Sequence, residues 1–97
     1  MNKIDYINRV ASNIFSAGIP AREAFILCAV AKLQWAGKEE VTSHDVSKLI
    51  GDSHISPTMK KMRFWFNIRV ARNSLNKMTY YYSLTDKGTE KIERIIA

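Results

Sequence analysis

The residue types that most often perform chemistry in proteins are few in this chain of 97 residues. It has one cysteine, Cys28, and two histidines, His44 and His54. A single cysteine cannot form a disulfide within the chain, and neither histidine has a second ligand at the spacing of a zinc site. Because Cys28 lies in an apolar segment with no nearby cation, we interpret it as an inert buried thiol. The histidines are either phosphate contacts or ordinary exposed side chains.

Motifs of known enzyme chemistry are also missing. The sequence contains no glycine-rich phosphate loop, no nucleophile elbow and no zincin helix. The adjacent carboxylates Glu39 and Glu40 fit an exposed loop better than a catalytic pair. We therefore expect a protein that is not an enzyme and that uses no metal and no cofactor.

The basic residues are the strongest chemical signal. Fifteen Lys and Arg residues against nine Asp and Glu residues give a net charge of +6. Residues 56–78 supply the whole excess, because they contain no acidic residue and the following basic ones: Lys60, Lys61, Arg63, Arg69, Arg72 and Lys77. Clustered cations neutralise phosphates and release condensed counterions, so the expected partner is a nucleic acid. A solvated face kept basic for solubility is the alternative, although such a face normally mixes both signs.

The hydrophobic pattern predicts the elements that position this basic segment. Length and composition fit a single α+β domain over residues 1–97, with most of its regular structure helical. Helical spacing and capping residues predict helices over 2–17, 21–36, 42–50, 57–66 and 86–97. Alternation with a period of two predicts a β-hairpin over 68–84, with its turn at 73–77, and 39–42 is expected to be briefly extended.

The helix over 57–66 carries the first basic residues. Ser56 is expected to cap it, and Pro57 suits the first helical position because no hydrogen-bond donor is needed there. Apolar residues at steps of four, three and four form a stripe expected to face the core: Ile55, Met59, Met62 and Phe66. The opposite, outward side carries Pro57, Lys60, Lys61, Phe64 and Asn67. We expect the six cations to share one surface built by this helix and the hairpin.

This order of elements resembles a winged helix-turn-helix domain. Residues 81–88 (YYSLTDKG) are similar to the end of the wing and the start of the last helix in MarR-like and PadR-like transcription regulators. Residues 41–51 are similar to the first helix of that motif and residues 56–59 to the start of its recognition helix. The turn at 51–56 is longer than usual, the wing is short, and the chain is smaller than typical MarR proteins. Small regulators of phages, plasmids and archaeal viruses are therefore closer in size.

The resemblance implies a winged helix-turn-helix with flanking N- and C-terminal helices that regulates transcription by binding double-stranded DNA. The recognition helix, 57–66, would enter the major groove, and the hairpin wing would contact the backbone or minor groove. The implied contacts are Ser56, Pro57, Thr58, Lys60, Lys61, Arg63, Phe64, Arg72, Asn73, Asn76 and Lys77. A plain hydrophilic turn remains the alternative for the wing, and Phe64 would touch either a thymine methyl group or a partner subunit.

Partners and location follow from the apolar residues. The first and last helices carry more apolar surface than a small domain needs, so we expect a homodimer formed through them. The longest apolar run, residues 24–31, is too short to span a membrane, and the first turns are polar, so we expect a cytoplasmic protein of a prokaryote or a virus-infected host cell. Two other functions remain open. One is a winged-helix module that binds an acidic protein. The other is RNA binding, which is weaker because most aromatic residues are expected to lie in the core.

Overall fold

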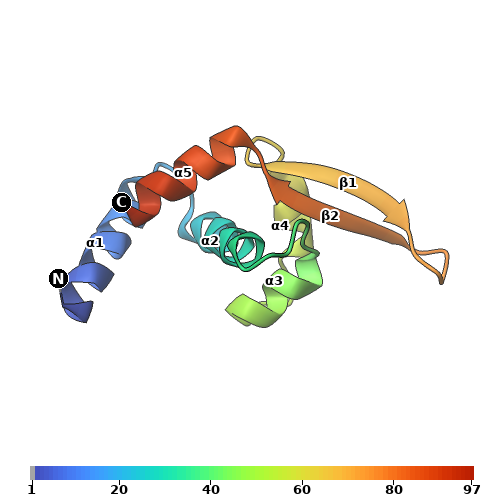
Figure 1. The fold of residues 1–97 in the computed structure, drawn as a ribbon, viewed down its shortest axis with the longest axis horizontal. Helices are drawn as coiled ribbons and strands as arrows, with labels where there is room; N and C mark the ends of the chain where they lie inside the picture. The colour runs from blue at the N-terminus through green and yellow to red at the C-terminus, as the bar shows by residue number, and fades with distance from the viewer. Residues whose placement is uncertain (1) are drawn as a thin grey trace.

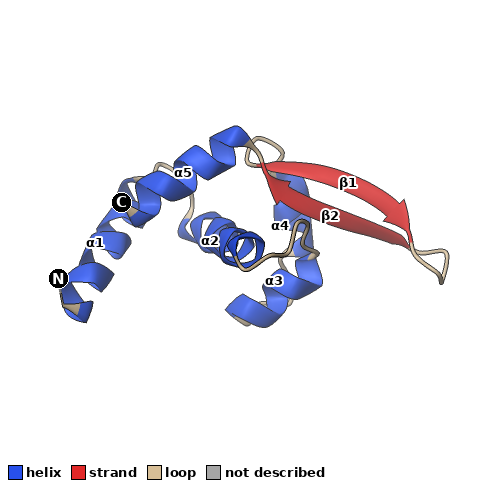
Figure 2. Cartoon of the chain, in the orientation of Figure 1, coloured by secondary structure: helices blue, strands red, loops and turns tan. Residues whose placement is uncertain are grey.

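Five helices and one antiparallel β-hairpin make up residues 2–97, the part of the chain that the structure, a computed structural model, describes. In chain order they are α1 (Lys3–Ser16), α2 (Ala21–Trp35), α3 (Ser43–Ile50), α4 (Ser56–Lys61), β1 (Phe66–Arg72), β2 (Met78–Leu84) and α5 (Asp86–Ile96). The α+β class expected from the sequence is confirmed. Figure 2 shows the hairpin projecting away from the helices.

Helix α2 is the centre of the fold. It contacts α1, α3, α4, α5 and β2, and it contributes six buried residues to the core. In Figure 1, α5 lies above α2 and α3 lies below it, while α1 and the end of the hairpin lie at opposite ends of the molecule. The dimensions, 49 × 24 × 23 Å, reflect this separation.

The predicted helix ends are confirmed where a side chain or a glycine sets them. Thr42 and Asp45 form a reciprocal capping box, with the Asp45 backbone N–H donating to Thr42 Oγ1 at 3.2 Å and the Thr42 backbone N–H donating to Asp45 Oδ2 at 2.9 Å. Gly51 ends α3 in the left-handed conformation, with φ of +72°. The Thr85 hydroxyl caps α5 by accepting the Gly88 backbone N–H at 3.0 Å.

The fourth helix is shorter than predicted. It begins at Ser56 without a side-chain cap and ends at Lys61, so the expected Ser56 cap and the span 57–66 are wrong. The backbone N–H groups of Trp65 and Phe66 both donate to the Met62 carbonyl at 3.0 Å, which closes a turn instead of continuing the helix. Phe66 then starts β1 and pairs with Leu84, two residues before the predicted start of the hairpin.

The apolar stripe is nevertheless buried as expected. Ile55 and Met59 are fully buried, and Met62 and Phe66 are 2% exposed. The ring of Phe66 packs edge-to-face on Tyr82, with centroids 5.9 Å apart. A turn after Met62 therefore buries the same four side chains as a continuous helix would, and aromatic and β-branched residues beyond it favour a strand.

The short extended segment before α3 forms one bridge to the hairpin. The Val41 backbone N–H donates to the Tyr82 carbonyl at 2.9 Å, and the Tyr82 N–H donates to the Val41 carbonyl at 2.8 Å. Val41 and Tyr82 are both fully buried. This bridge fixes the base of the hairpin against the helices.

Candidate nucleic-acid interface

Helix α4 presents its two lysines to solvent. Lys60 and Lys61 directly follow Met59, whose burial turns them outward, and both are exposed. At the start of the helix Pro57 is exposed, while Ser56 and Thr58 are half-buried. The lysines therefore lie on the outward face of α4, where the sequence analysis expects them.

A contact between Lys60 and the hairpin links α4 to β2. The Lys60 ammonium nitrogen lies 4.3 Å from the centroid of the Tyr80 ring, a cation–π contact. Tyr80 pairs with Val70, and two residues further along the ladder Arg72 pairs with Met78. Side chains two residues apart in a strand share a face, so Arg72 lies on the same face of the hairpin as Tyr80, which is the face turned toward Lys60.

The turn at residues 73–77, called the hairpin tip below, is held by hydrogen bonds within it. Asn73 Oδ1 accepts the backbone N–H groups of Leu75 and Lys77 at 2.9 and 3.0 Å. Arg72 Nη1 donates to the Asn76 carbonyl at 3.2 Å, and Asn76 has φ of +60°. Asn73 and Asn76 thus shape the turn, whatever else they contact, and Lys77 is exposed beside them.

Arg63 and Phe64 lie in the turn between α4 and β1, not on a helix face. This corrects the expectation that Phe64 shares the outward face of α4 with the lysines. Phe64 is 61% exposed and packs edge-to-face on Trp65, with centroids 4.7 Å apart. Both rings border a hollow of about 240 Å³ with Lys87 and other residues of α5. DNA contact by Phe64 stays a prediction.

Arg69 lies on the other face of the hairpin from Arg72 and is paired with an acidic residue. Its guanidinium donates to both carboxylate oxygens of Glu40 at 2.9–3.1 Å and lies 4.4 Å from the centroid of the Tyr81 ring. Arg69 and Tyr81 pair across the strands, one position away from Tyr80, so they lie on the opposite face of the hairpin. Hydrogen bonding from Arg69 lowers the pKa of Glu40, and the same contact raises the pKa of Arg69. The expectation that all six cations share one surface is wrong for Arg69.

The other five basic residues of the segment have no carboxylate within 4.0 Å anywhere in residues 2–97. These unpaired cations are Lys60, Lys61, Arg63, Arg72 and Lys77. They lie on α4, on the turn after it and on the far half of the hairpin. Without an acid to neutralise them, they give these segments a positive potential, which attracts polyanions.

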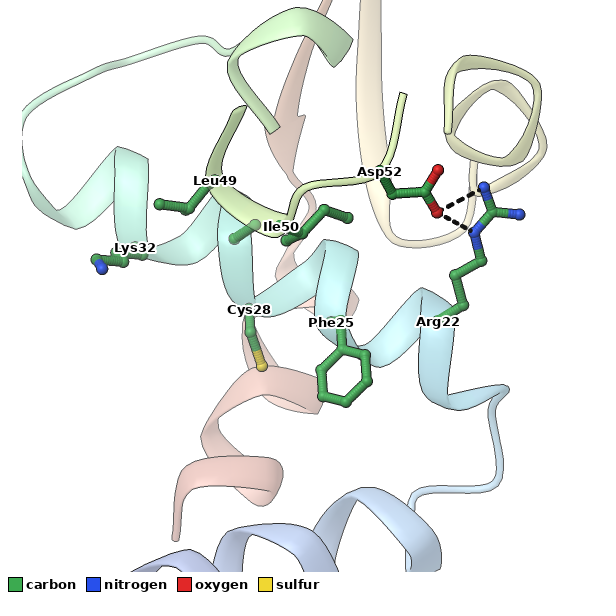
Figure 3. A pocket seen from close by; sticks show the side chains of 8 residues that line it. Arg22, Phe25, Cys28, Lys32, Leu49, Ile50 and Asp52 are labelled. Atoms are coloured by element: carbon green, nitrogen blue, oxygen red, sulfur yellow. Dashed lines mark hydrogen bonds and ion pairs between the residues drawn. The ribbon is translucent and has the colours of Figure 1, made fainter. Parts of the chain in front are cut away.

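Two larger hollows within residues 2–97 have mainly apolar walls. One, between α2 and α3, has a volume of about 550 Å³, and Figure 3 shows its lining residues. There Arg22 is turned to Asp52, with Nε donating at 3.0 Å, and the Lys32 ammonium points away from the half-buried Cys28. Burial raises the pKa of the Cys28 thiol, which favours its protonated form over the reactive thiolate.

A second apolar hollow, of about 750 Å³, lies between α1 and the start of α2. Its lining includes Tyr6, Ile7, Phe15 and Phe25. No residue of α1 is buried, and Phe15 is 93% exposed. The apolar side of α1 is therefore open to solvent over most of its length.

Comparison of the chain with protein-family models, with curated proteins and with solved structures gives no match. Within residues 2–97, no three His, Cys, Asp or Glu side chains come close enough to hold a metal ion. In the same residues no single helix is long and apolar enough to cross a membrane, and α1 and α2 meet that test only as a pair bent by 119°. The winged-helix resemblance thus rests on the residues of this chain and on its layout.

Proposed function

We propose that this chain is a winged-helix regulator of transcription that binds double-stranded DNA. Helix α4 enters the major groove, and the hairpin acts as the wing on the backbone and minor groove. The observation that carries the proposal is the set of five unpaired cations on α4, the following turn and the hairpin. The order of α3, α4 and the hairpin supports it as well, because a helix-turn-helix places its second helix beside the wing.

The length of α4 limits how it reads DNA. Six residues at 1.5 Å per residue give a helix about 9 Å long, shorter than the roughly 12 Å width of the major groove. We expect the first residues, Ser56 to Thr58, to approach base edges and the two lysines to contact phosphates or guanine. Such a short reading helix favours a second copy of the domain on a neighbouring half-site.

The dimer that supplies this copy is expected to form through α1 and α2. The closing helix α5 buries Ile92 and Ile95 within its own chain, whereas α1 has no fully buried residue and packs only Val10 and Ile14 partly against the core. The accessible surface is 6492 Å², compared with about 5,650 Å² for a typical monomer of this mass. The surplus of roughly 800 Å² is close to what one partner buries in a standard interface. The exposure of α1 therefore narrows the expected dimer surface from both terminal helices to α1 and the adjoining Phe25.

A salt titration tests the proposal. Fluorescence anisotropy of a labelled 30-base-pair duplex is measured against protein concentration between 50 and 200 mM salt. Five phosphate contacts predict a slope of log K against log salt of about −4.5 per chain, which is a loss of affinity of about 500-fold over this range. A slope near zero, or binding to polyglutamate and not to DNA, would contradict DNA binding and support the acidic-protein alternative.

A further inference from the structure

Resting on the proposed DNA binding, we propose that Leu75, at the hairpin tip, is an apolar wedge that enters the minor groove and bends the duplex. The hairpin tip is the part of the wing farthest from the helices (Figure 1). Leu75 is 72% exposed there, and nothing in residues 2–97 covers it. Gly, Pro, Asn, Asp and Ser normally occupy turns of this kind, so a leucine at the end of the hairpin departs from the usual composition of a turn.

The turn presents Leu75 in a fixed position. The Leu75 backbone N–H donates to Asn73 Oδ1 at 2.9 Å, and the Asn73 N–H donates to the Lys77 carbonyl at the same distance. Asn76 closes the turn in the left-handed conformation and donates its N–H to the Asn73 carbonyl. A residue whose backbone is held by its own turn loses little backbone conformational entropy when its side chain inserts, which favours a wedge over a loose contact.

The residues around Leu75 fit the edges of a minor groove. Arg72 and Lys77 lie on either side of it in the sequence, and neither has a carboxylate partner in the described chain. The minor groove is about 6 Å wide, so it admits one side chain at a time while cations contact the phosphates that border it. Leucine is one of the side chains that proteins insert between base steps to kink DNA.

Two further apolar side chains extend the same surface. Met78 is 52% exposed and Val70 is 42% exposed, and both lie on the hairpin face that carries Arg72. On a bent duplex they would meet the sugars that the bend brings closer. An acidic protein partner would satisfy the cations but gives no reason for a leucine at the farthest point of the wing.

The test uses a duplex selected from a random library with the full-length protein. Dyes at its two ends report the bend by energy transfer, and 2-aminopurine along the site reports unstacking of individual base steps. The variants are Leu75→Ala, which removes the wedge, and Leu75→Met, which keeps an apolar side chain of similar length. Leu49→Ala is the matched control, because Leu49 is an exposed leucine on α3.

The wild-type protein, Leu75→Met and Leu49→Ala are expected to bend the duplex by roughly 20° or more and to unstack one step per wing. Leu75→Ala is expected to leave the duplex straight while keeping the salt slope, since no cation is lost. A mismatch at the contacted step should raise the affinity of the wild-type protein severalfold and leave Leu75→Ala unaffected. Equal bending by Leu75→Ala, or a straight duplex with the wild-type protein, overturns the wedge but not DNA binding. A lack of salt-dependent duplex binding overturns both.

Discussion

Gly88 lies where α5 packs against the turn between α4 and β1. Whether replacing Gly88 by alanine stabilises or destabilises the protein depends on how closely these two segments approach each other. A β-carbon at Gly88 would overlap the Trp65 carbonyl oxygen and lie 3.1 Å from Leu84 Cδ2. The Trp65 carbonyl is backbone, and it accepts the Thr85 N–H at 2.9 Å, so it cannot move without losing that bond. Helix propensity alone predicts the reverse effect, because alanine stabilises a helix relative to glycine.

The magnitude follows from these opposing effects. Overpacking costs about 1–3 kcal/mol, and loss of the Thr85 hydrogen bond costs about 1 kcal/mol. The gain in helix propensity offsets roughly 0.5–1 kcal/mol. We therefore expect Gly88→Ala to lower the free energy of unfolding by about 1–3 kcal/mol, which lowers Tm by roughly 4–24 °C in a domain of this size.

Circular dichroism during heating measures this change. Glu93→Ala is the matched control, because Glu93 is exposed on the same helix and should change stability by no more than about 0.5 kcal/mol. If Gly88→Ala unfolds at or above the wild-type temperature, the close approach of α5 to the turn after α4 is not as described, and the position of α4 relative to the hairpin is in doubt.

Four further variants test separate parts of the structure. Arg72→Gln should reduce the slope of log K against log salt for duplex binding by about 0.9. Arg69→Gln should leave this slope unchanged, since Arg69 lies on the other face of the hairpin. Equal effects of the two variants would contradict the assignment of Arg69 and Arg72 to different faces. Burial opposes ionisation of Asp45, but hydrogen bonds from Lys38 and from the helix cap outweigh burial and lower the pKa of Asp45. The ionised carboxylate therefore stabilises the fold above about pH 4, and this stabilisation is lost as the pH falls through the lowered pKa. Urea unfolding should show Asp45→Asn less stable than wild type at pH 7 and equal to it near pH 2. Sedimentation should show a dimer for the wild-type protein at micromolar concentration and a monomer for Phe15→Glu. A monomeric wild-type protein would contradict the expected dimer.

Local sequence signals predicted most of the fold. Thr42 with Asp45, Gly51 and Thr85 set helix ends through bonds or dihedral angles that involve only neighbouring residues, which is why these ends were predictable. The apolar spacing also identified a buried set, from Ile55 to Phe66. It failed to give the conformation after Met62, because a turn and a helix bury the same residues and only pairing with β2 decides between them.

The candidate site was predictable only in part, because two of its features depend on contacts between distant segments. The acid-free segment identified the cations, but the partner of Arg69 is Glu40, 29 residues earlier in the chain. The ladder register separates Arg69 from Arg72, and this register depends on how β1 and β2 pair. The sequence pattern did not identify Leu75 as a functional residue, because the exposure of this leucine follows from the way the turn projects from the molecule.

The most direct test of the central claim compares two variants of equal charge. Lys60→Glu with Lys61→Glu and Lys32→Glu with Arg94→Glu each change the net charge by −4, from +6 to +2, but only the first pair lies on α4. Loss of two charge-assisted phosphate contacts, at about 1.5 kcal/mol or more each, predicts at least roughly 100-fold weaker duplex binding by the α4 variant and a nearly unchanged thermal transition. The Lys32 and Arg94 variant should bind almost as the wild-type protein does. Equal affinity of the two variants would contradict the assignment of DNA binding to α4.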